Sequence, residues 1–188
     1  ISWYQARNLP PTVVLIPAIQ SELDQKFVAR GFTKYLDVLV MVKDFEINLP
    51  AENLEKQDLE FLISDTPTLD WLALQGDQNL EPIMLRSPAK YVSLFQQGKL
   101  IGVGRVGLQE DWAVFSRLFL SPEFRGRGYG RKLLNALEAV ANRPKYALQV
   151  DANNQVAIKL YESAGYQTHH LFRIRELPRQ IDLAQDCC

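Results

Sequence analysis

The stretch Arg125-Gly126-Arg127-Gly128-Tyr129-Gly130 decides the fold class of this chain. It lies between an apolar run, 112–120, typical of a central strand, and a segment, 128–142, whose apolar residues recur at helical spacing. The first N–H groups of a helix lack internal partners, and the helix dipole makes that end positive. Because glycines let a phosphate reach these N–H groups, the order strand, glycine loop, helix predicts an α/β fold with a phosphate-binding loop.

The bulk composition gives no competing signal. The 188 residues carry a formal net charge of −1, with 47% hydrophobic and 23% charged residues, as in an ordinary globular domain. A near-neutral chain has no general attraction for nucleic acid or for an anionic membrane, so we expect neither partner. The attraction for phosphate must then come from local charges, which are Arg125, Arg127, Arg131 and Lys132.

The ends of the sequence give two expectations. The two cysteines, Cys187 and Cys188, are adjacent and therefore poor candidates for a structural disulfide, so we expect a reducing, cytoplasmic setting. The chain opens on Ile1 rather than methionine, and we expect an upstream piece to be missing.

A second glycine cluster, Gly102-Val103-Gly104-Arg105-Val106-Gly107, formally matches a dinucleotide-binding fingerprint. That motif functions only where a helix starts at the glycines. Here a second strand follows instead, so we reject the dinucleotide interpretation. We expect these glycines to allow close packing or a bulge in a hairpin made of 91–96, a turn at 97–98, and 100–108.

The chain also contains a weak internal repeat. A shift of 134 positions lays residues 1–42, the front segment, over residues 135–176, the rear segment, without a gap, and Gly31 falls on Gly165. Each segment predicts a strand, a helix ending at that glycine, and a second strand. The predicted elements are 12–16, 21–30 and 33–42 in the front segment, and 146–150, 154–164 and 167–175 in the rear segment.

These patterns divide the chain into four predicted regions. Residues 1–47 form the C-terminal half of a degenerate repeat, 48–56 a polar, proline-containing linker, 57–176 the main domain, and 177–188 a tail. Within the main domain, 59–63 is predicted to be a strand, and 66–74 a helix with Ser64 or Asp65 as its cap.

Two stretches resemble motifs of the GCN5-related N-acetyltransferase (GNAT) family. Residues 118–130 resemble motif A, with its Arg/Gln-x-x-Gly-x-Gly/Ala core at 125–130. Residues 154–166 resemble motif B, Asn-x-x-Ala-x-x-Leu-Tyr-x-x-x-Gly-aromatic. The motifs occur in the family's order with a strand between them, and the likeness covers roughly 57–176.

The resemblance implies a mixed, mostly antiparallel, twisted sheet, flanked by helices, that splays between the strands at 112–120 and 146–151. It implies acetyl-CoA as cosubstrate, with the pantetheine arm on one strand and the pyrophosphate on the glycine loop. The implied cofactor-binding residues are Leu118, Phe119, Leu120, Arg125, Gly126, Arg127, Gly128, Tyr129, Gly130, Arg131, Asn154 and Tyr161. It also implies that an amine attacks the thioester directly and that the departing thiolate needs a proton.

Tyr161 is the predicted general acid, with Asn154 as its companion. The two residues are two helical turns apart and so face the same way. A phenol with a pKa of about 10 stays protonated at pH 7 and can donate to a thiolate. The alternatives are a core aromatic for Tyr161 and a helix cap for Asn154. The front segment has Phe27 and Gln20 instead, so we expect it to be inactive and to form a pseudo-dimer with the main domain, or the chain to form a homodimer.

The general base and the amine stay open. Some family members that acetylate protein N-termini carry a glutamate where this chain has Gln149, which cannot act as a base. The candidate bases are Glu110, Asp111, Ser116, Asp151, His169 and His170. Residues that either shape a substrate pocket or belong to the ordinary surface and core are Asp65, Asp70, Asp77, Glu81, Trp71 and Trp112. No cluster has metal-ligand spacing.

The sequence therefore predicts an acetyltransferase that acts on a primary amine of a small molecule or peptide. The alternative is an acyl-CoA-binding regulatory module without turnover.

Overall fold

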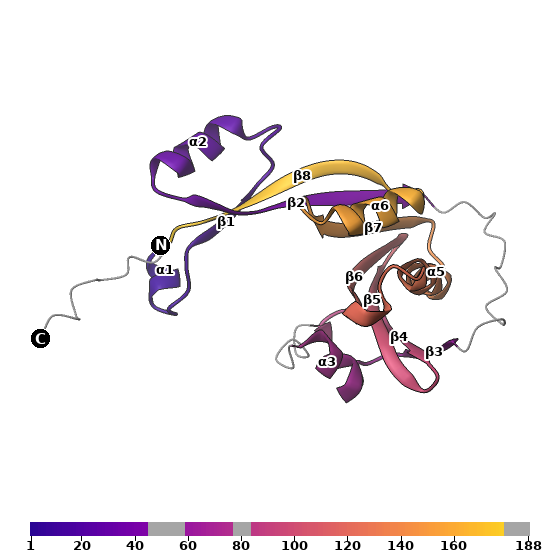
Figure 1. The fold of residues 1–188 in the computed structure, drawn as a ribbon. Coiled ribbons are helices and arrows are strands. Elements are labelled where there is room, and N and C mark those ends of the chain that lie inside the picture. The colour runs from indigo at the N-terminus through magenta and orange to yellow at the C-terminus, as the bar shows by residue number, and fades with distance from the viewer. Residues whose placement is uncertain (45–58, 77–83, 179–188) are drawn as a thin grey trace, which may run out of the picture. The chain divides into compact units, whose positions relative to one another are not determined.

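The computed structural model of the protein describes residues 1–44, 59–76 and 84–178 (Figure 1). The predicted linker, Asp77, Glu81 and both cysteines lie outside these residues. The helices and strands are α1 Ser2–Gln5, β1 Thr12–Leu15, α2 Ser21–Ala29, β2 Thr33–Asp44, β3 Leu59–Ser64, α3 Leu69–Gln75, β4 Ala89–Gln96, β5 Lys99–Gln109, β6 Trp112–Leu120, α5 Tyr129–Ala141, β7 Lys145–Asp151, α6 Gln155–Ser163 and β8 Gln167–Glu176. In these ranges no helix is long and apolar enough to cross a membrane.

The strands form one mixed sheet in the order β1-β8-β2-β7-β6-β5-β4-β3 (Figure 1). The pairs β1–β8, β3–β4, β4–β5 and β5–β6 are antiparallel, whereas β6–β7 is parallel. This confirms the predicted α/β class with a mostly antiparallel sheet flanked by helices.

The chain divides into two compact units, which we describe separately. Of the described residues, the first unit contains 1–40, 150–155 and 168–178, and the second contains 41–44, 59–76, 84–149 and 156–167.

Within the second unit, β3 to β6 form a meander with α3 on one face and α5 on the other. On one face Trp71 and Leu72 of α3 pack with Tyr91 and Val103, all nearly or completely buried. On the other face α5 approaches β5 so closely that a methyl group added to Gly104 would lie 2.6 Å from the Leu137 side chain. The glycine cluster in β5 is therefore a packing surface for α5, as expected from the strand that follows it.

The start of α3 differs from the prediction. Helix 66–74 capped by Ser64 or Asp65 was expected, whereas α3 begins at Leu69 and Thr68 is its cap. The Thr68 hydroxyl accepts a hydrogen bond from the Trp71 N–H at 3.1 Å. Pro67 gives the physical reason, because a proline disfavours helical backbone at the residue before it.

A buried ion network holds the first unit together. Asp24, on the inward face of α2, accepts hydrogen bonds from Arg175 (Nη2 to Oδ2, 2.8 Å) and Arg173 (3.2 Å) on β8. Arg173 also donates two hydrogen bonds, at 2.7 and 3.0 Å, to Asp37 on β2. The two arginines lie on the same face of β8 because side chains two apart along a strand point the same way.

Candidate active site

The predicted phosphate loop has an open, left-handed glycine geometry. After β6, a 3-10 helix, Pro122–Phe124, leads into the loop, and α5 follows from Tyr129. Gly126 (φ 74°) and Gly128 (φ 81°) adopt left-handed conformations that strain other residues, and Gly128 is the N-cap of α5. A methyl group added to either glycine would meet no atom within 4 Å. The space beside both glycines, at the start of α5, is therefore open, as an anion site requires.

The side chains around this loop divide into anchors and exposed charges. Arg125 donates to the Leu120 carbonyl at 3.0 Å, and Arg131 donates to the Ser163 hydroxyl at 2.6 Å. Arg127 is exposed, with its guanidinium carbon 5.7 Å from the centre of the Phe124 ring. The Tyr129 side chain is buried and its hydroxyl accepts a hydrogen bond from Gln96 at 2.7 Å, so only its backbone can face a ligand at the loop.

Within the described residues, the β7-facing edge of β6 is paired only over its first four residues. β6 pairs with β7 only from Trp112–Phe115 to Lys145–Leu148 in the part of the chain that the structure describes, although β6 continues to Leu120. On its other side, the register with β5 shifts at Gly104, and Arg117 has a left-handed φ of 58°. The Gln75 amide of α3 donates to the Arg117 carbonyl at 2.7 Å and so holds this bulge. The backbone of Leu118–Leu120 thus follows a bulge along an unpaired edge.

Tyr161 lies in the last turn and a half of α6, which closes with a Schellman motif. The N–H of Tyr166 donates to the Tyr161 carbonyl at 3.0 Å, the N–H of Gly165 donates to the Glu162 carbonyl at 2.9 Å, and Gly165 has a φ of 89°. The rings of Tyr161 and Tyr166 meet edge to face, with their centres 6.0 Å apart. Tyr161 is only 7% exposed, and this burial raises the pKa of its phenol, which keeps it protonated.

Two contacts bring the end of α6 to the glycine loop. The Arg131–Ser163 hydrogen bond joins the first turn of α5 to the last turn of α6. A methyl group on Gly130 would lie 3.3 Å from the Leu160 side chain, the residue before Tyr161. The structure thus places the loop and the Tyr161 turn side by side. Asn154 directly precedes α6, is exposed, and donates its N–H to the Asp151 carbonyl at 2.9 Å.

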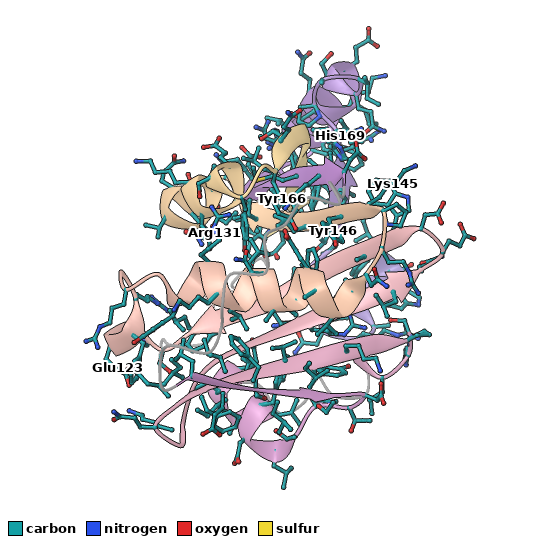
Figure 2. The ribbon with its side chains drawn as sticks, turned by 90° about the vertical axis from the view of Figure 1, so that its right-hand side faces the viewer. Glu123, Arg131, Lys145, Tyr146, Tyr166 and His169 are labelled. Carbon is teal, nitrogen blue, oxygen red and sulfur yellow. The ribbon has the colours of Figure 1, made fainter. Side chains whose placement is uncertain are left out.

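A buried polar network next to Tyr161 was missed by sequence reasoning. The Glu138 carboxylate on α5 is 1% exposed and accepts hydrogen bonds from Lys43 (3.0 and 3.1 Å) and from the Tyr166 hydroxyl (2.9 Å). Tyr146 donates its hydroxyl to the main-chain carbonyl of Glu138 at 3.2 Å. Figure 2 shows Tyr146 and Tyr166 next to one another alongside α5. Burial and the Glu138 charge raise the pKa of Tyr146 to about 12 and the pKa of Tyr166 further still.

The candidate bases and substrate residues come from several different elements of the fold. The Asp151 carboxylate accepts the Asn153 N–H at 2.8 Å, and Asp65 is paired with Lys90. Glu110 and Asp111 form the exposed β5–β6 turn, and Ser116 is half-buried in β6. His169 and His170 are neighbours on β8 with their Nδ1 atoms 2.7 Å apart. Trp71 is a core residue, whereas Trp112 is 38% exposed.

Comparison with known proteins now identifies the family. A family model described as "Acetyltransferase (GNAT) family" matches residues 52–166, which include the glycine loop, β7 and α6. The chain belongs to the GNAT acetyltransferase family. Members of this family use acetyl-CoA as cosubstrate, and the open glycine loop of this chain fits a pyrophosphate.

One curated relative matches part of this chain. The catalytic subunit NAA20 of the N-terminal acetyltransferase B complex of Arabidopsis thaliana is 34% identical over 84 residues, which are 42% of this chain and 45% of that protein. The chain therefore matches less than half the length of this curated relative.

Solved structures share the fold over most of the chain. A GCN5-related N-acetyltransferase from Sphaerobacter thermophilus matches with a TM-score of 0.67 at 19% identity, over 97% of this chain and 67% of that one. A second, from Kribbella flavida, has a TM-score of 0.67 at 13% identity, over 95% and 72%. A tandem GNAT protein from the clavulanic acid biosynthesis pathway has a TM-score of 0.66 at 13% identity, over 95% and 67%.

Proposed function

We propose that this GNAT protein transfers the acetyl group of acetyl-CoA to a primary amine by direct attack, with Tyr161 as general acid. The observation that carries the proposal is the junction of the glycine loop with the end of α6, made by the Arg131–Ser163 hydrogen bond and the Gly130–Leu160 contact. It brings a site suited to a pyrophosphate next to the helical turn that bears a buried, protonated phenol.

Each part of the site has a role in this proposal. The N–H groups of residues 126–131 bind the pyrophosphate, with Arg125 and Arg127 adding positive charge. The edge of Leu118, Phe119 and Leu120 that faces away from β5 binds the pantetheine arm, and Asn154 orients the arm by a hydrogen bond. Acetyl-CoA, when bound, supplies an activated thioester. Tyr161 donates its proton to the sulfur as the thiolate leaves, and its raised pKa keeps that proton available over the physiological range.

The amine belongs to a small molecule or to a peptide. The name of the NAA20 relative supports a peptide N-terminus, but the match covers less than half of that protein. Gln149 occupies the place where some family members carry a glutamate, and its amide cannot accept a proton. The proton of the attacking amine must therefore leave through another group.

We further propose that residues 1–47 are the C-terminal half of a degenerate repeat. Both segments have a strand, a helix and a strand, and the sheet order β1-β8-β2-β7 is unchanged when β1 is exchanged with β7 and β2 with β8. The front segment also closes α2 as the rear segment closes α6: Phe32 N–H donates to the Phe27 carbonyl at 3.0 Å, and the two rings are 5.0 Å apart. Such an interleaved pair is what an intramolecular pseudo-dimer requires.

The first experiment is thermal unfolding with and without acetyl-CoA. Ligand at about 100 times its Kd adds about 2.7 kcal/mol of stability, which is a shift of about 5–10 °C for a chain of this size. We expect Gly128→Val to abolish the shift, while Gly76→Val, which strains an equivalent left-handed glycine at the end of α3, keeps it. No shift in the wild-type chain at millimolar acetyl-CoA would contradict the proposed cofactor site.

The second experiment tests turnover. Tyr161→Phe should lower kcat for thiol release by about 100-fold while the Kd for acetyl-CoA stays within about twofold. A regulatory module without turnover would release no thiol with any amine, and its acetyl-CoA binding would be indifferent to the substitution.

A further inference from the structure

The rear segment contains polar groups that its fold does not require. The Schellman motif and its ring pair occur twice, as Phe27–Phe32 in the front segment and as Tyr161–Tyr166 in the rear segment. Two phenylalanines close α2 in the same way that two tyrosines close α6. The hydroxyl of Tyr166 is thus dispensable for this turn, yet it is buried and needs a partner.

That partner is itself an unfavourable group to bury. Glu138 lies on the apolar face of α5 and is 1% exposed, and a carboxylate in such a place requires compensation by charge and hydrogen bonds. Lys43 supplies the charge and Tyr166 the further hydrogen bond. The front segment has Tyr4 at the place of Glu138 and Thr12 at the place of Tyr146, so it lacks this network.

We propose that Tyr166 and Glu138, held by Lys43, are positioning residues that fix the ring of Tyr161 for proton donation. Glu138 holds Tyr166 at its hydroxyl end, and the Schellman hydrogen bonds hold it at its backbone. The Tyr166 side chain is therefore held at both ends, and the plane of its ring makes an angle of 63° with the plane of the Tyr161 ring. Tyr166 therefore limits the movement of the Tyr161 ring on the side where the two rings meet. This inference rests on the proposed role of Tyr161.

A double-mutant cycle tests whether Tyr166 acts through Tyr161. Tyr166→Phe keeps the ring, introduces the residue that the front segment has at this place (Phe32), and removes only the hydroxyl that anchors the ring to Glu138. We expect kcat to fall about tenfold, with KM for acetyl-CoA within about twofold, because small misplacements of a reacting group are costly. In the Tyr161→Phe background the same substitution should change kcat by less than about twofold, since no general acid is left to position.

Tyr146→Phe is the matched control. It also removes a buried hydroxyl bound to Glu138, but its acceptor is the main-chain carbonyl, whereas Tyr166 binds the carboxylate and meets the ring of Tyr161. It should lower the melting temperature about as much as Tyr166→Phe and leave kcat within about twofold. If Tyr166→Phe is poorly folded, the same cycle is run with Glu138→Gln, which leaves both rings in place and weakens the anchor, with kcat reduced only where Tyr161 is present.

The outcomes separate the two proposals. Equal losses of kcat from Tyr166→Phe and Tyr146→Phe, or equal losses in both backgrounds of the cycle, would overturn the positioning role while leaving Tyr161 as general acid. An unchanged kcat in Tyr161→Phe would overturn the general acid and the positioning role together, and the acetyl-CoA binding measurement would still stand on its own.

Discussion

Replacement of Lys43 by methionine should destabilise the protein far more than the loss of an ordinary surface ion pair. The Lys43 ammonium lies 3.0 and 3.1 Å from the two carboxylate oxygens of Glu138, and the two side chains are 13% and 1% exposed. Removal of one partner from a buried pair costs about 3–5 kcal/mol, because the other charge stays buried without compensation. Methionine keeps most of the aliphatic stem, so the substitution isolates the charge.

The magnitude can be measured by urea unfolding at pH 7, followed by far-ultraviolet circular dichroism. In thermal unfolding, at about 2–4 °C per kcal/mol, the same loss of 3 kcal/mol lowers Tm by about 6–12 °C. The double variant Lys43→Met/Glu138→Gln should be more stable than Lys43→Met alone, because the uncompensated charge is gone while Tyr166 keeps an acceptor oxygen.

An exposed pair provides the control. Lys99 and Glu123 lie 3.1 Å apart, but their side chains are 62% and 55% exposed, so Lys99→Met should cost at most about 1 kcal/mol. If Lys43→Met cost no more than Lys99→Met, the reasoning about a buried, charge-compensated Glu138 would be refuted.

Three further outcomes follow from the described contacts. Arg175 lowers the pKa of Asp24 chiefly through a hydrogen bond, against the opposing effect of burial. Asp24 therefore stabilises the fold above its unfolded pKa of about 3.9, and this stabilisation is lost as the pH falls through the folded pKa. The difference in unfolding free energy between wild type and Asp24→Asn should be constant near neutrality and shrink below about pH 4. Gly104→Ala should cost about 1–3 kcal/mol by overpacking against Leu137, and the added Leu137→Ala should relieve that clash, which a double-mutant cycle would detect as a favourable coupling. Because the pKa of Tyr146 is raised to about 12, the unfolded chain releases that proton first, so stability should fall between about pH 10 and 12, and Tyr146→Phe should flatten this decline in urea titrations.

The elements that the sequence predicts well are those whose signals are local. The bounds of β6 match the predicted 112–120, and those of α5 lie within one residue of 128–142, because an apolar run and a glycine cap define them. The α3 boundary was wrong by three residues because Thr66, Thr68 and Ser64 all offer cap oxygens, and only the backbone around Pro67 decides among them. The short α1 lacks any periodic signal.

The polar network is invisible to such reasoning because its parts are far apart in the chain. Glu138 did carry a signal, since it lies one helical turn after Leu134 and next to Leu137 on an otherwise apolar face of α5. Its compensating charge, Lys43, is 95 residues away on another element. A charged residue on an apolar helical face thus indicates that a partner exists, but the partner can be identified only from the tertiary structure.

Comparison of the two Schellman motifs distinguishes the groups that the fold requires from the hydroxyls that the proposed reaction requires. Phe27 and Phe32 show that a ring pair without hydroxyls closes a helix against its glycine in this architecture. A chain with phenylalanine at both 161 and 166 should therefore fold, with α6 intact by circular dichroism, and still bind acetyl-CoA at the glycine loop. It should nevertheless release thiol no faster than Tyr161→Phe alone. If instead this double variant failed to fold, the hydroxyls would be part of the structural core, and the buried Glu138 would serve stability rather than the orientation of Tyr161.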